Sequence, residues 1–313
     1  MRPLVYSFTL LALLAFSCGS VAQKSTMDSW QYPFPVHYHD VNDSLRLAYV
    51  DEGKGERTLV FVHGLGSNLQ AWKKNVAALR KDYRCIALDL PGYGKSGKGE
   101  FPYSMDFFAE SLDALIRGLE LEKVTLVGHS MGGQIAMTLA LQRPDYLEKM
   151  VLAAPAGLES FSETDRTFFA TYVRPEILMA TPEAQIKKNF AVNFFDMPED
   201  AQFMIQDRLA LREDSAAYAA YCAMIPRCVM GMLDAPVANR LGAIEVPTLI
   251  LFGENDQLIP NKILHPTLTV ATVAEVGEKG IPGAQLSFLP ESGHFVQWEK
   301  SDRFNTYLRQ FIQ

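Results

Sequence analysis

Strand-like and helix-like runs alternate along most of this chain, and no other feature limits its possible folds as much. The expected strands cover residues 45–50, 58–62, 85–90, 124–127, 150–154, 248–252 and 285–289, and the expected helices cover 68–81, 105–119, 131–143, 261–279 and 298–312. Strands that are separated by a helix usually pair in parallel. The alternation therefore predicts an α/β fold in which a mostly parallel sheet carries helices on both faces.

The alternation stops once, between residues 158 and 240. This segment shows no convincing strand, but it is helix-rich and contains many aromatic and methionine side chains. We expect an inserted helical cap over 158–240, which divides the sheet domain into residues 23–157 and 241–313. Because ligand sites are mostly apolar, such a cap is expected to roof a site and to line an acyl pocket.

The N-terminus is typical of an export signal, and we assign residues 1–22 to a signal peptide. Arg2 precedes an apolar run over 4–16, and small residues follow up to Ala22. Cleavage after Ala22 would give a periplasmic or secreted protein. Cleavage before Cys18 would instead leave a lipidated first residue and a membrane-anchored lipoprotein. We expect no other stretch to be long and charge-free enough to cross a bilayer.

Charge excludes one broad class of partner. The 313 residues contain 29 Lys and Arg against 36 Asp and Glu, so the formal net charge is −7. A nucleic-acid-binding protein needs a basic surface that meets the phosphates. We therefore expect no nucleic-acid partner.

The cysteines leave one question open. Cys222 and Cys228 could form a disulfide in an oxidising compartment if Pro226 breaks a helix between them. Two buried thiols fit the sequence equally well, and the spacing does not resemble a zinc site. Cys85 lies in a strand-like run and is expected in the core.

The strongest chemical signal is a G-x-S-x-G motif formed by Gly128, Ser130 and Gly132, between an expected strand and an expected helix. In that position the motif forms a strained turn that projects the serine hydroxyl above the sheet. Glycine at 128 and 132 leaves room for close packing of the strand and the helix. Ser130 is therefore the candidate nucleophile.

A serine hydroxyl needs a base, because its own pKa is too high for attack at neutral pH. His294 follows the last expected strand, on a loop where its ring can swing over Ser130. It is the candidate base. His37, His39 and His265 lie outside comparable contexts and are expected to be surface or packing residues.

The base in turn needs a carboxylate that orients it and stabilises the imidazolium. Asp256 follows the strand at 248–252, so it is expected at the carboxyl edge of the sheet, where sites form in such folds. Asp256 is the candidate acid. Glu159 and Asp234 remain as alternatives.

The negative charge that develops on an attacked carbonyl oxygen needs backbone donors. Met131 provides one N–H at the start of a helix, and Leu65 provides a second in the loop after the strand at 58–62. Together they form the candidate oxyanion hole. His63 is expected to brace this loop rather than to transfer protons.

Several motifs together carry a family resemblance. They are His63-Gly64, the segment 89–96, the segment 128–133, the segment 253–256 and Gly293-His294. On these residues the chain resembles, from about residue 36 to its end, a capped α/β-hydrolase of the lipase and esterase-like branch. Residues 155–158 are similar to monoacylglycerol-lipase-like members, and the chain order Ser130, Asp256, His294 is the order of this fold.

The resemblance implies a serine hydrolase that cleaves carboxylic esters through an acyl-enzyme. It implies a small-molecule ester or lipid-like substrate with a short-to-medium acyl chain, and neither a cofactor nor a metal. Because one fold hosts many reactions, a C–C bond hydrolase or a perhydrolase with the same triad is the alternative. A non-catalytic binding protein is a remote alternative, since such a protein would normally show a broken triad.

Two phosphate-binding patterns are rejected. Residues 92–97 match G-x-G-x-x-G, but residues 98–102 do not open a helix as a dinucleotide site requires. Residues 94–96 resemble the end of a P-loop, yet Asp89 stands where that motif needs its first glycine. We therefore expect a tight turn beside the site.

Overall fold

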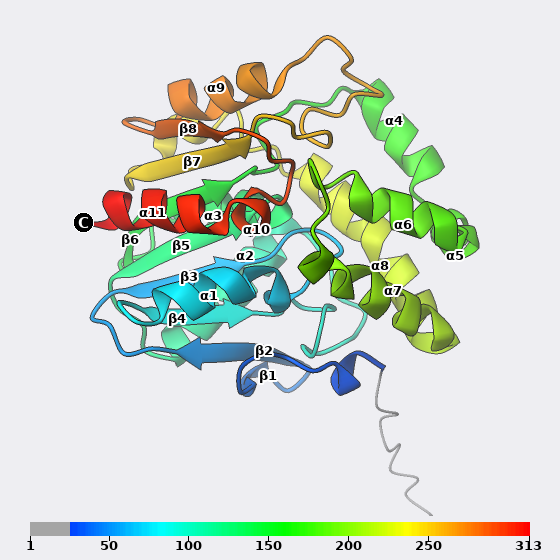
Figure 1. Cartoon of the computed structure of the whole chain (residues 1–313), viewed down its shortest axis with the longest axis horizontal. Coiled ribbons are helices and arrows are strands. Elements are labelled where there is room, and N and C mark those ends of the chain that lie inside the picture. Colours follow the sequence, from blue (N-terminus) through cyan, green and yellow to red (C-terminus); the bar gives the residue numbers. More distant parts are fainter. Residues whose placement is uncertain (1–25) are drawn as a thin grey trace, which may run out of the picture.

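A computed structural model describes residues 26–313 and confirms the α/β-hydrolase fold (Figure 1). Eight strands form one sheet in the order β1-β2-β4-β3-β5-β6-β7-β8. They are β1 (His37–Asn42), β2 (Leu45–Glu52), β3 (Thr58–Val62), β4 (Arg84–Leu88), β5 (Val124–His129), β6 (Leu147–Ala153), β7 (Thr248–Gly253) and β8 (Gln285–Leu289). Strand β2 pairs antiparallel with β1 and β4, and the other pairings are parallel. The expected export signal lies outside the described residues.

Helices cover both faces of this sheet. The helices α1 (Lys73–Leu79) and α11 (Ser301–Ile312) pack together on one face, and α2 (Met105–Gly118), α3 (Met131–Ala140) and α9 (Val270–Gly280) share a core on the other. The short helix α10 (Val296–Glu299) leads into α11. The strands thus form the middle of three layers.

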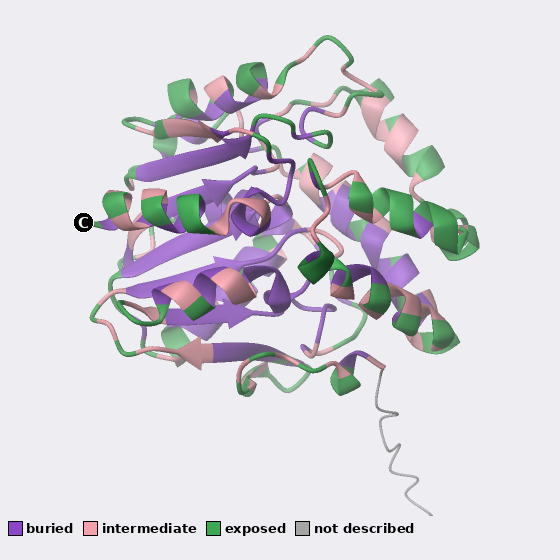
Figure 2. Cartoon of the chain, in the orientation of Figure 1, coloured by how far each residue is buried: buried purple, intermediate pink, exposed green. Residues whose placement is uncertain are grey.

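Strand β3 shows why the sheet is sandwiched in this way. Its side chains alternate between the faces, as in any strand. Leu59 and Phe61 belong to the core of α1 and α11, whereas Val60 and Val62 belong to the core of α2, α3 and α9. All five residues of β3 are buried, as are most residues of the central strands (Figure 2). A continuous apolar run therefore reports burial on both sides.

The structure differs from the expectation mainly at one strand and at the starts of two helices. Strand β1 was not predicted, because it pairs on one side only and all of its side chains are exposed or half-buried. The helix expected over 68–81 begins with a 3-10 turn, η2 (Leu69–Trp72). Residues 261–269 are loop, because Thr269 accepts the N–H of Thr272 at 3.1 Å and caps α9 there.

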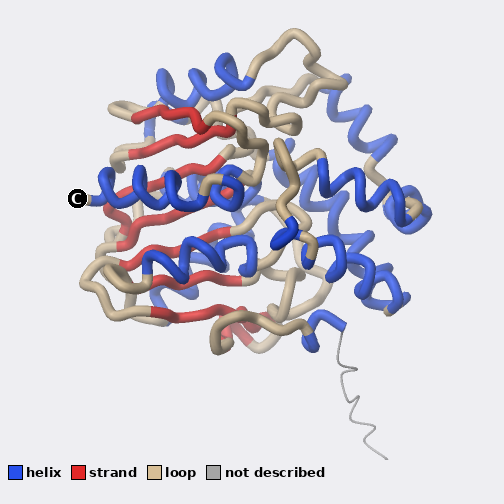
Figure 3. The backbone as a smooth tube through the Cα atoms, in the orientation of Figure 1, coloured by secondary structure: helices blue, strands red, loops and turns tan. Residues whose placement is uncertain are grey.

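The insertion between β6 and β7 is helical, as expected. It contains α4 (Glu163–Tyr172), α5 (Pro175–Ala180), α6 (Glu183–Ala191), α7 (Phe203–Glu213) and α8 (Ser215–Asp234), with a 3-10 turn, η3 (Glu199–Ala201). These helices lie beyond the carboxyl ends of the parallel strands (Figure 3). We call them the cap.

Helix α8 corrects one expectation and decides another question. Contrary to the expectation that no such stretch follows the N-terminus, α8 is long and apolar enough to span a membrane, although it packs against α4, α5 and α7 within the cap. It runs through Pro226 without interruption. Cys222 and Cys228 are free, buried thiols, and Tyr93 Oη donates a hydrogen bond to Cys228 Sγ at 3.3 Å.

Candidate active site

Strand register brings the functional loops to one level of the sheet. Val62 lies opposite Gly128, and His129 lies opposite Ala153. The loops that follow β3, β5 and β6 therefore start side by side. This is the edge at which sites of open α/β sheets form.

Ser130 occupies the turn between β5 and α3 with φ 52° and ψ −119°. This conformation is costly for a residue with a side chain, and the surrounding structure holds it. The Ser130 N–H donates to the Ala153 carbonyl, and the Ser130 carbonyl accepts the Ala156 N–H, both at 3.0 Å. The strained turn is thus fixed on both sides.

Close packing at this turn explains the two glycines of the motif. A Cβ atom on Gly128 would lie 2.4 Å from the Gly132 carbonyl oxygen, and one on Gly132 would lie 2.3 Å from the Val62 carbonyl oxygen. Real Cβ atoms do not approach backbone oxygens so closely. A side chain at either position would therefore push α3 away from the sheet.

The structure places His294 beside Asp256. The distance from His294 Nδ1 to Asp256 Oδ2 is 2.8 Å, and both side chains are buried. The other carboxylate oxygen, Oδ1, accepts the N–H groups of Leu258 at 2.8 Å and Ile259 at 3.0 Å. With Nδ1–H donating to this fixed carboxylate, His294 Nε2 is left as a proton acceptor.

Ser130 and His294 line one cavity of about 500 Å³. Most of the other lining residues are apolar, and many come from the cap. The inserted segment contributes Phe161, Phe169, Val229, Met232 and Leu233, and the loop after β7 contributes Leu258 and Ile259. The cavity is therefore a largely apolar chamber with a serine and a histidine in its wall.

Both candidate oxyanion donors adjoin Ser130. Met131 is the first residue of α3, so its N–H is one of the unpaired donors at the helix N-terminus. Leu65 lines the cavity, and a Cβ atom on its neighbour Gly64 would lie only 3.0 Å from Ser130 Cβ. Their role in catalysis stays a prediction.

Two side chains hold the loop that carries Leu65. His63 Nδ1 contacts the Gly64 carbonyl at 2.8 Å, and His63 Nε2 accepts the Leu90 N–H at 3.1 Å. Burial lowers the pKa of His63 to about 4, so the ring stays neutral. Arg208, on cap helix α7, donates to the Gly66 carbonyl at 2.7 Å. Arg208 was not predicted, because no local sequence motif links a cap residue to this loop.

The alternative acids have other partners. Glu159 accepts a hydrogen bond from His265 Nδ1 at 2.5 Å, and Asp234 pairs with Arg166 at 2.6 Å. Glu159 therefore joins the start of the inserted segment to the loop after β7, whereas Asp234 joins two helices within the cap, α8 and α4. His265, which was expected to be a surface or packing residue, is an ion-pair partner in this cluster.

His129 was also missed as a functional neighbour. Its ring is buried against those of His294 and Phe295, at centroid distances of 4.8 and 4.7 Å. Its Nε2 lies 3.0 Å from the carbonyl oxygen of His294. Burial and the neighbouring His294 lower the pKa of His129 well below its usual range, so the ring is a neutral donor to the His294 backbone.

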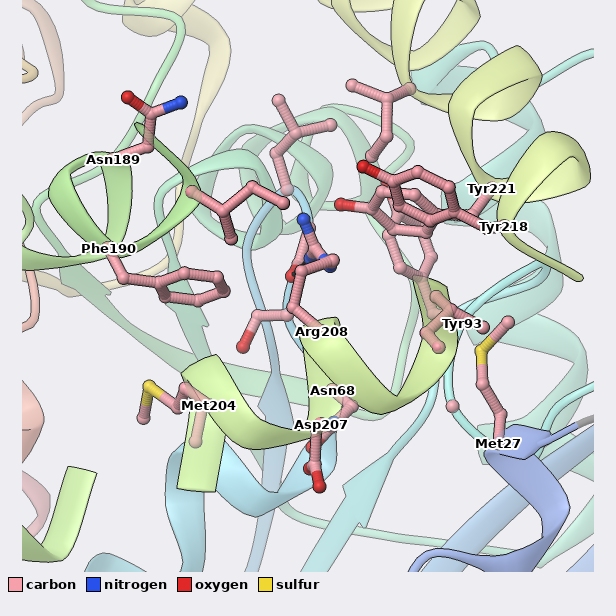
Figure 4. A pocket seen from close by; sticks show the side chains of 18 of the residues that line it. Met27, Asn68, Tyr93, Asn189, Phe190, Met204, Asp207, Arg208, Tyr218 and Tyr221 are labelled. Atoms are coloured by element: carbon pink, nitrogen blue, oxygen red, sulfur yellow. Dashed lines mark hydrogen bonds between the residues drawn. The ribbon is translucent and has the colours of Figure 1, made fainter. Parts of the chain in front are cut away.

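A second cavity of about 240 Å³ lies between the cap and the loop after β3 (Figure 4). Arg208 extends into it, with its guanidinium carbon 4.1 Å from the Tyr221 ring centroid and 5.3 Å from that of Phe190. Desolvation raises the pKa of the adjacent Asp207 to about 6. The two cavities share Leu65, Asn193 and Phe295 as wall residues.

Among residues 26–313, no group of three or more His, Cys, Asp or Glu side chains is arranged to hold a metal ion.

Comparisons with known proteins agree with this geometry. A family model described as alpha/beta hydrolase fold matches residues 57–174. The 2-hydroxy-6-oxononadienedioate/2-hydroxy-6-oxononatrienedioate hydrolase 1 of Pseudomonas putida is 29% identical over 296 residues, covering 88% of this chain and 95% of that protein. A probable hydrolytic enzyme from Pseudomonas aeruginosa aligns with a TM-score of 0.81 and 25% identity, covering 92% of this chain and 98% of that one. An esterase from Exiguobacterium antarcticum shares the fold, with a TM-score of 0.73, 24% identity and coverage of 88% and 98%.

The sheet order, the serine turn and these matches define the class: the chain belongs to the α/β-hydrolase superfamily. Within that superfamily it is a hydrolase. Fold alone does not select the substrate, which has to be argued from the site.

Proposed function

We propose that the protein is a serine hydrolase that cleaves carboxylic esters through an acyl-enzyme. One observation carries the proposal: Ser130 and the His294 ring, which is hydrogen-bonded to Asp256, line the same apolar cavity. This combination supplies a nucleophile, a base and an orienting carboxylate in one chamber. Such a site needs no cofactor.

In the first half of the reaction Ser130 Oγ attacks the acyl carbonyl carbon. His294 Nε2 takes the hydroxyl proton, and Asp256 stabilises the imidazolium that results. The carbonyl oxygen becomes negatively charged and accepts the N–H groups of Leu65 and Met131. When the tetrahedral intermediate collapses, His294 returns the proton to the departing alcohol and the acyl group stays on Ser130.

In the second half a water molecule attacks the acyl-enzyme. His294 takes one proton from this water, and the same backbone donors stabilise the second oxyanion. Collapse breaks the bond to Ser130 Oγ, which recovers its proton from His294. One ester and one water thus yield one acid and one alcohol.

The cavity wall favours an uncharged acyl group. Its lining residues include Glu159 but, among the described residues, no Lys or Arg. A buried carboxylate without a cation to meet it is costly. An aliphatic or aromatic acyl chain instead gains free energy from the apolar wall.

C–C bond hydrolysis is the second candidate, and the comparisons favour it specifically. The Pseudomonas putida relative is named for a dicarboxylate substrate, and it aligns over nearly its whole length. In this chain Arg208 lines the neighbouring cavity, where it is the cation that a carboxylate-bearing substrate would meet. Such a substrate would have to reach across the wall formed by Leu65 and Phe295.

A substrate panel tests the proposal. The purified chain without residues 1–22 is assayed on p-nitrophenyl esters, on a matching anilide, on a vinylogous 1,5-diketone and for peracid formation. We expect ester turnover that disappears in Ser130→Ala. Turnover of the diketone with no ester turnover would instead establish the C–C hydrolase.

We also propose that the protein is exported. The support is the N-terminal sequence: a basic residue, an apolar run and small residues around Cys18 and Ala22. The full chain and a Cys18→Ala variant would be fractionated after metabolic labelling with a fatty acid. Fatty-acid label on the unaltered chain but not on Cys18→Ala would indicate a lipoprotein. An unlabelled soluble form outside the cytoplasm would indicate a secreted protein. Retention of the unaltered chain in the cytoplasm would contradict export.

A further inference from the structure

The carboxylate of Glu299 joins two loops that lie about a hundred residues apart in the chain. Glu299 ends α10, and its Oε2 accepts the Gly293 N–H at 2.7 Å. Its Oε1 accepts the N–H groups of Phe195 at 2.9 Å and Asp196 at 3.1 Å. Gly293 immediately precedes His294, whereas Phe195 and Asp196 belong to the cap segment between α6 and α7.

The two loops also touch directly. The Phe295 N–H donates to the Asn193 carbonyl at 3.1 Å, and the rings of Phe194 and Phe295 stack at 5.1 Å with 16° between their planes. A Cβ atom on Gly293 would lie 2.8 Å from the Asn193 carbonyl oxygen. The residues on either side of His294, Gly293 and Phe295, therefore pack directly against the cap segment.

Glu299 provides the ionic part of this contact. Burial raises the pKa of its carboxyl, and the three N–H donors oppose that rise because they favour the charged form. Hydrogen bonds to a charged carboxylate are stronger than neutral ones. An amide at this position would keep only one acceptor oxygen and would turn an NH₂ group toward a backbone N–H.

We propose that Glu299 is a positioning residue for His294 and that it makes the position of this base depend on the cap. The inference rests on the proposed function, in which His294 is the base. Through Gly293 it sets where the His294 ring stands relative to Ser130 and Asp256. Through Phe195 and Asp196 it couples the position of the His294 ring to the cap segment. A small displacement of a catalytic group can cost about 10²-fold in rate.

The test is Glu299→Gln, with Glu291→Gln as the matched control. Glu291 lies on the same loop, but its side chain is exposed and pairs loosely with Lys300 at 3.6 Å. On p-nitrophenyl butyrate, with active sites counted by organophosphonate titration, we expect Glu299→Gln to lower kcat by about 10²-fold. KM should change little, because binding in the apolar cavity is unaltered. Glu291→Gln should behave as the unaltered protein.

A milder variant guards against loss of folding. Glu299→Asp keeps the carboxylate but retracts it by one methylene, so its kcat should fall between those of the unaltered protein and Glu299→Gln. Hydrogen exchange should rise in Glu299→Gln at residues 193–196 and 291–296 together. An unchanged kcat per titrated site in the folded variants would overturn the positioning role, and faster exchange in only one segment would overturn the coupling to the cap. Loss of turnover in Ser130→Ala together with full turnover in Glu299→Gln would reject this inference alone, whereas turnover in Ser130→Ala would reject the proposed function.

Discussion

At the scale of single residues, the site depends on how the backbone presents each side chain. Ser130 projects from a strained turn. The backbone around His294 is held by His129, which contacts the His294 carbonyl, and by Glu299, which accepts the N–H of the preceding Gly293. One carboxylate oxygen of Asp256 accepts two backbone N–H groups, and the other accepts the hydrogen bond from His294. The backbone turn of Ser130 and the side chains of His294 and Asp256 are thus fixed before a substrate enters, as electrostatic preorganisation requires.

Ser130→Ala removes the hydroxyl and keeps the turn. We expect kcat for ester hydrolysis to fall on the order of 10⁶-fold, while the melting temperature changes little, because only the nucleophile is lost. An organophosphonate probe should label Ser130 in the unaltered chain, as peptide mass spectrometry can show. Labelling at another residue, or near-normal turnover in the variant, would refute the nucleophile.

Asp256→Asn tests the carboxylate. An amide beside Nδ1 disfavours the tautomer that leaves Nε2 free, so kcat should fall by about 10⁴-fold with KM nearly unchanged. Asp234→Asn and Glu159→Gln are the controls, since these carboxylates pair with Arg166 and His265. The assignment fails if either control loses turnover while Asp256→Asn keeps it.

At the scale of elements, the sequence pattern predicted those strands and site residues whose positions depend on neighbouring residues in the chain. The buried central strands were found because a strand covered on both faces is a continuous apolar run. Strand β1 was not found, because its mostly exposed side chains leave no such run. The serine turn, His294 and Asp256 could be located because each follows a strand at one sheet edge. Arg208 and Glu299 could not, because they act on backbone groups far away in sequence.

The junction between α4 and the loop after β7 should respond to pH. His265 lies between Glu159 and Asp165, with its Nε2 3.4 Å from Asp165 Oδ2, and Phe161 stacks on its ring. Although desolvation alone would lower it, the pKa of His265 is raised by these two carboxylates. A raised folded-state pKa contributes stability that is fully present below the unfolded value of about 6.5. That contribution is lost as pH rises through the folded pKa.

The measurement is thermal unfolding from pH 5 to 9 for the unaltered chain and His265→Gln. The gap in melting temperature should be largest at low pH and should shrink as the pH rises. His37→Gln is the control, because His37 is exposed on the edge strand β1 and its ring contacts Tyr49. A gap that is constant with pH would show that His265 stabilises this junction only as a neutral packing residue.

At the scale of the whole molecule, the cap and the sheet form the site jointly. The sheet edge supplies Ser130, Asp256 and His294, and the cap supplies most of the apolar wall above them. Arg208 and Glu299 each connect the cap to a loop of the sheet domain. Substrate choice should therefore depend on the cap, while the chemistry depends on the sheet edge.

The final prediction concerns acyl chain length. On p-nitrophenyl esters, kcat/KM should rise from acetate to a medium-chain ester by up to about fourfold per methylene, or about 0.8 kcal/mol, and then flatten or fall once the cavity is full. Val229→Phe places a larger side chain in the wall on α8 and should move the optimum to shorter chains. Val276→Phe, at an exposed position on α9, should leave the profile unchanged. If acetate is the best ester for the unaltered chain, or if Val229→Phe leaves the optimum in place, the cavity does not hold the acyl chain.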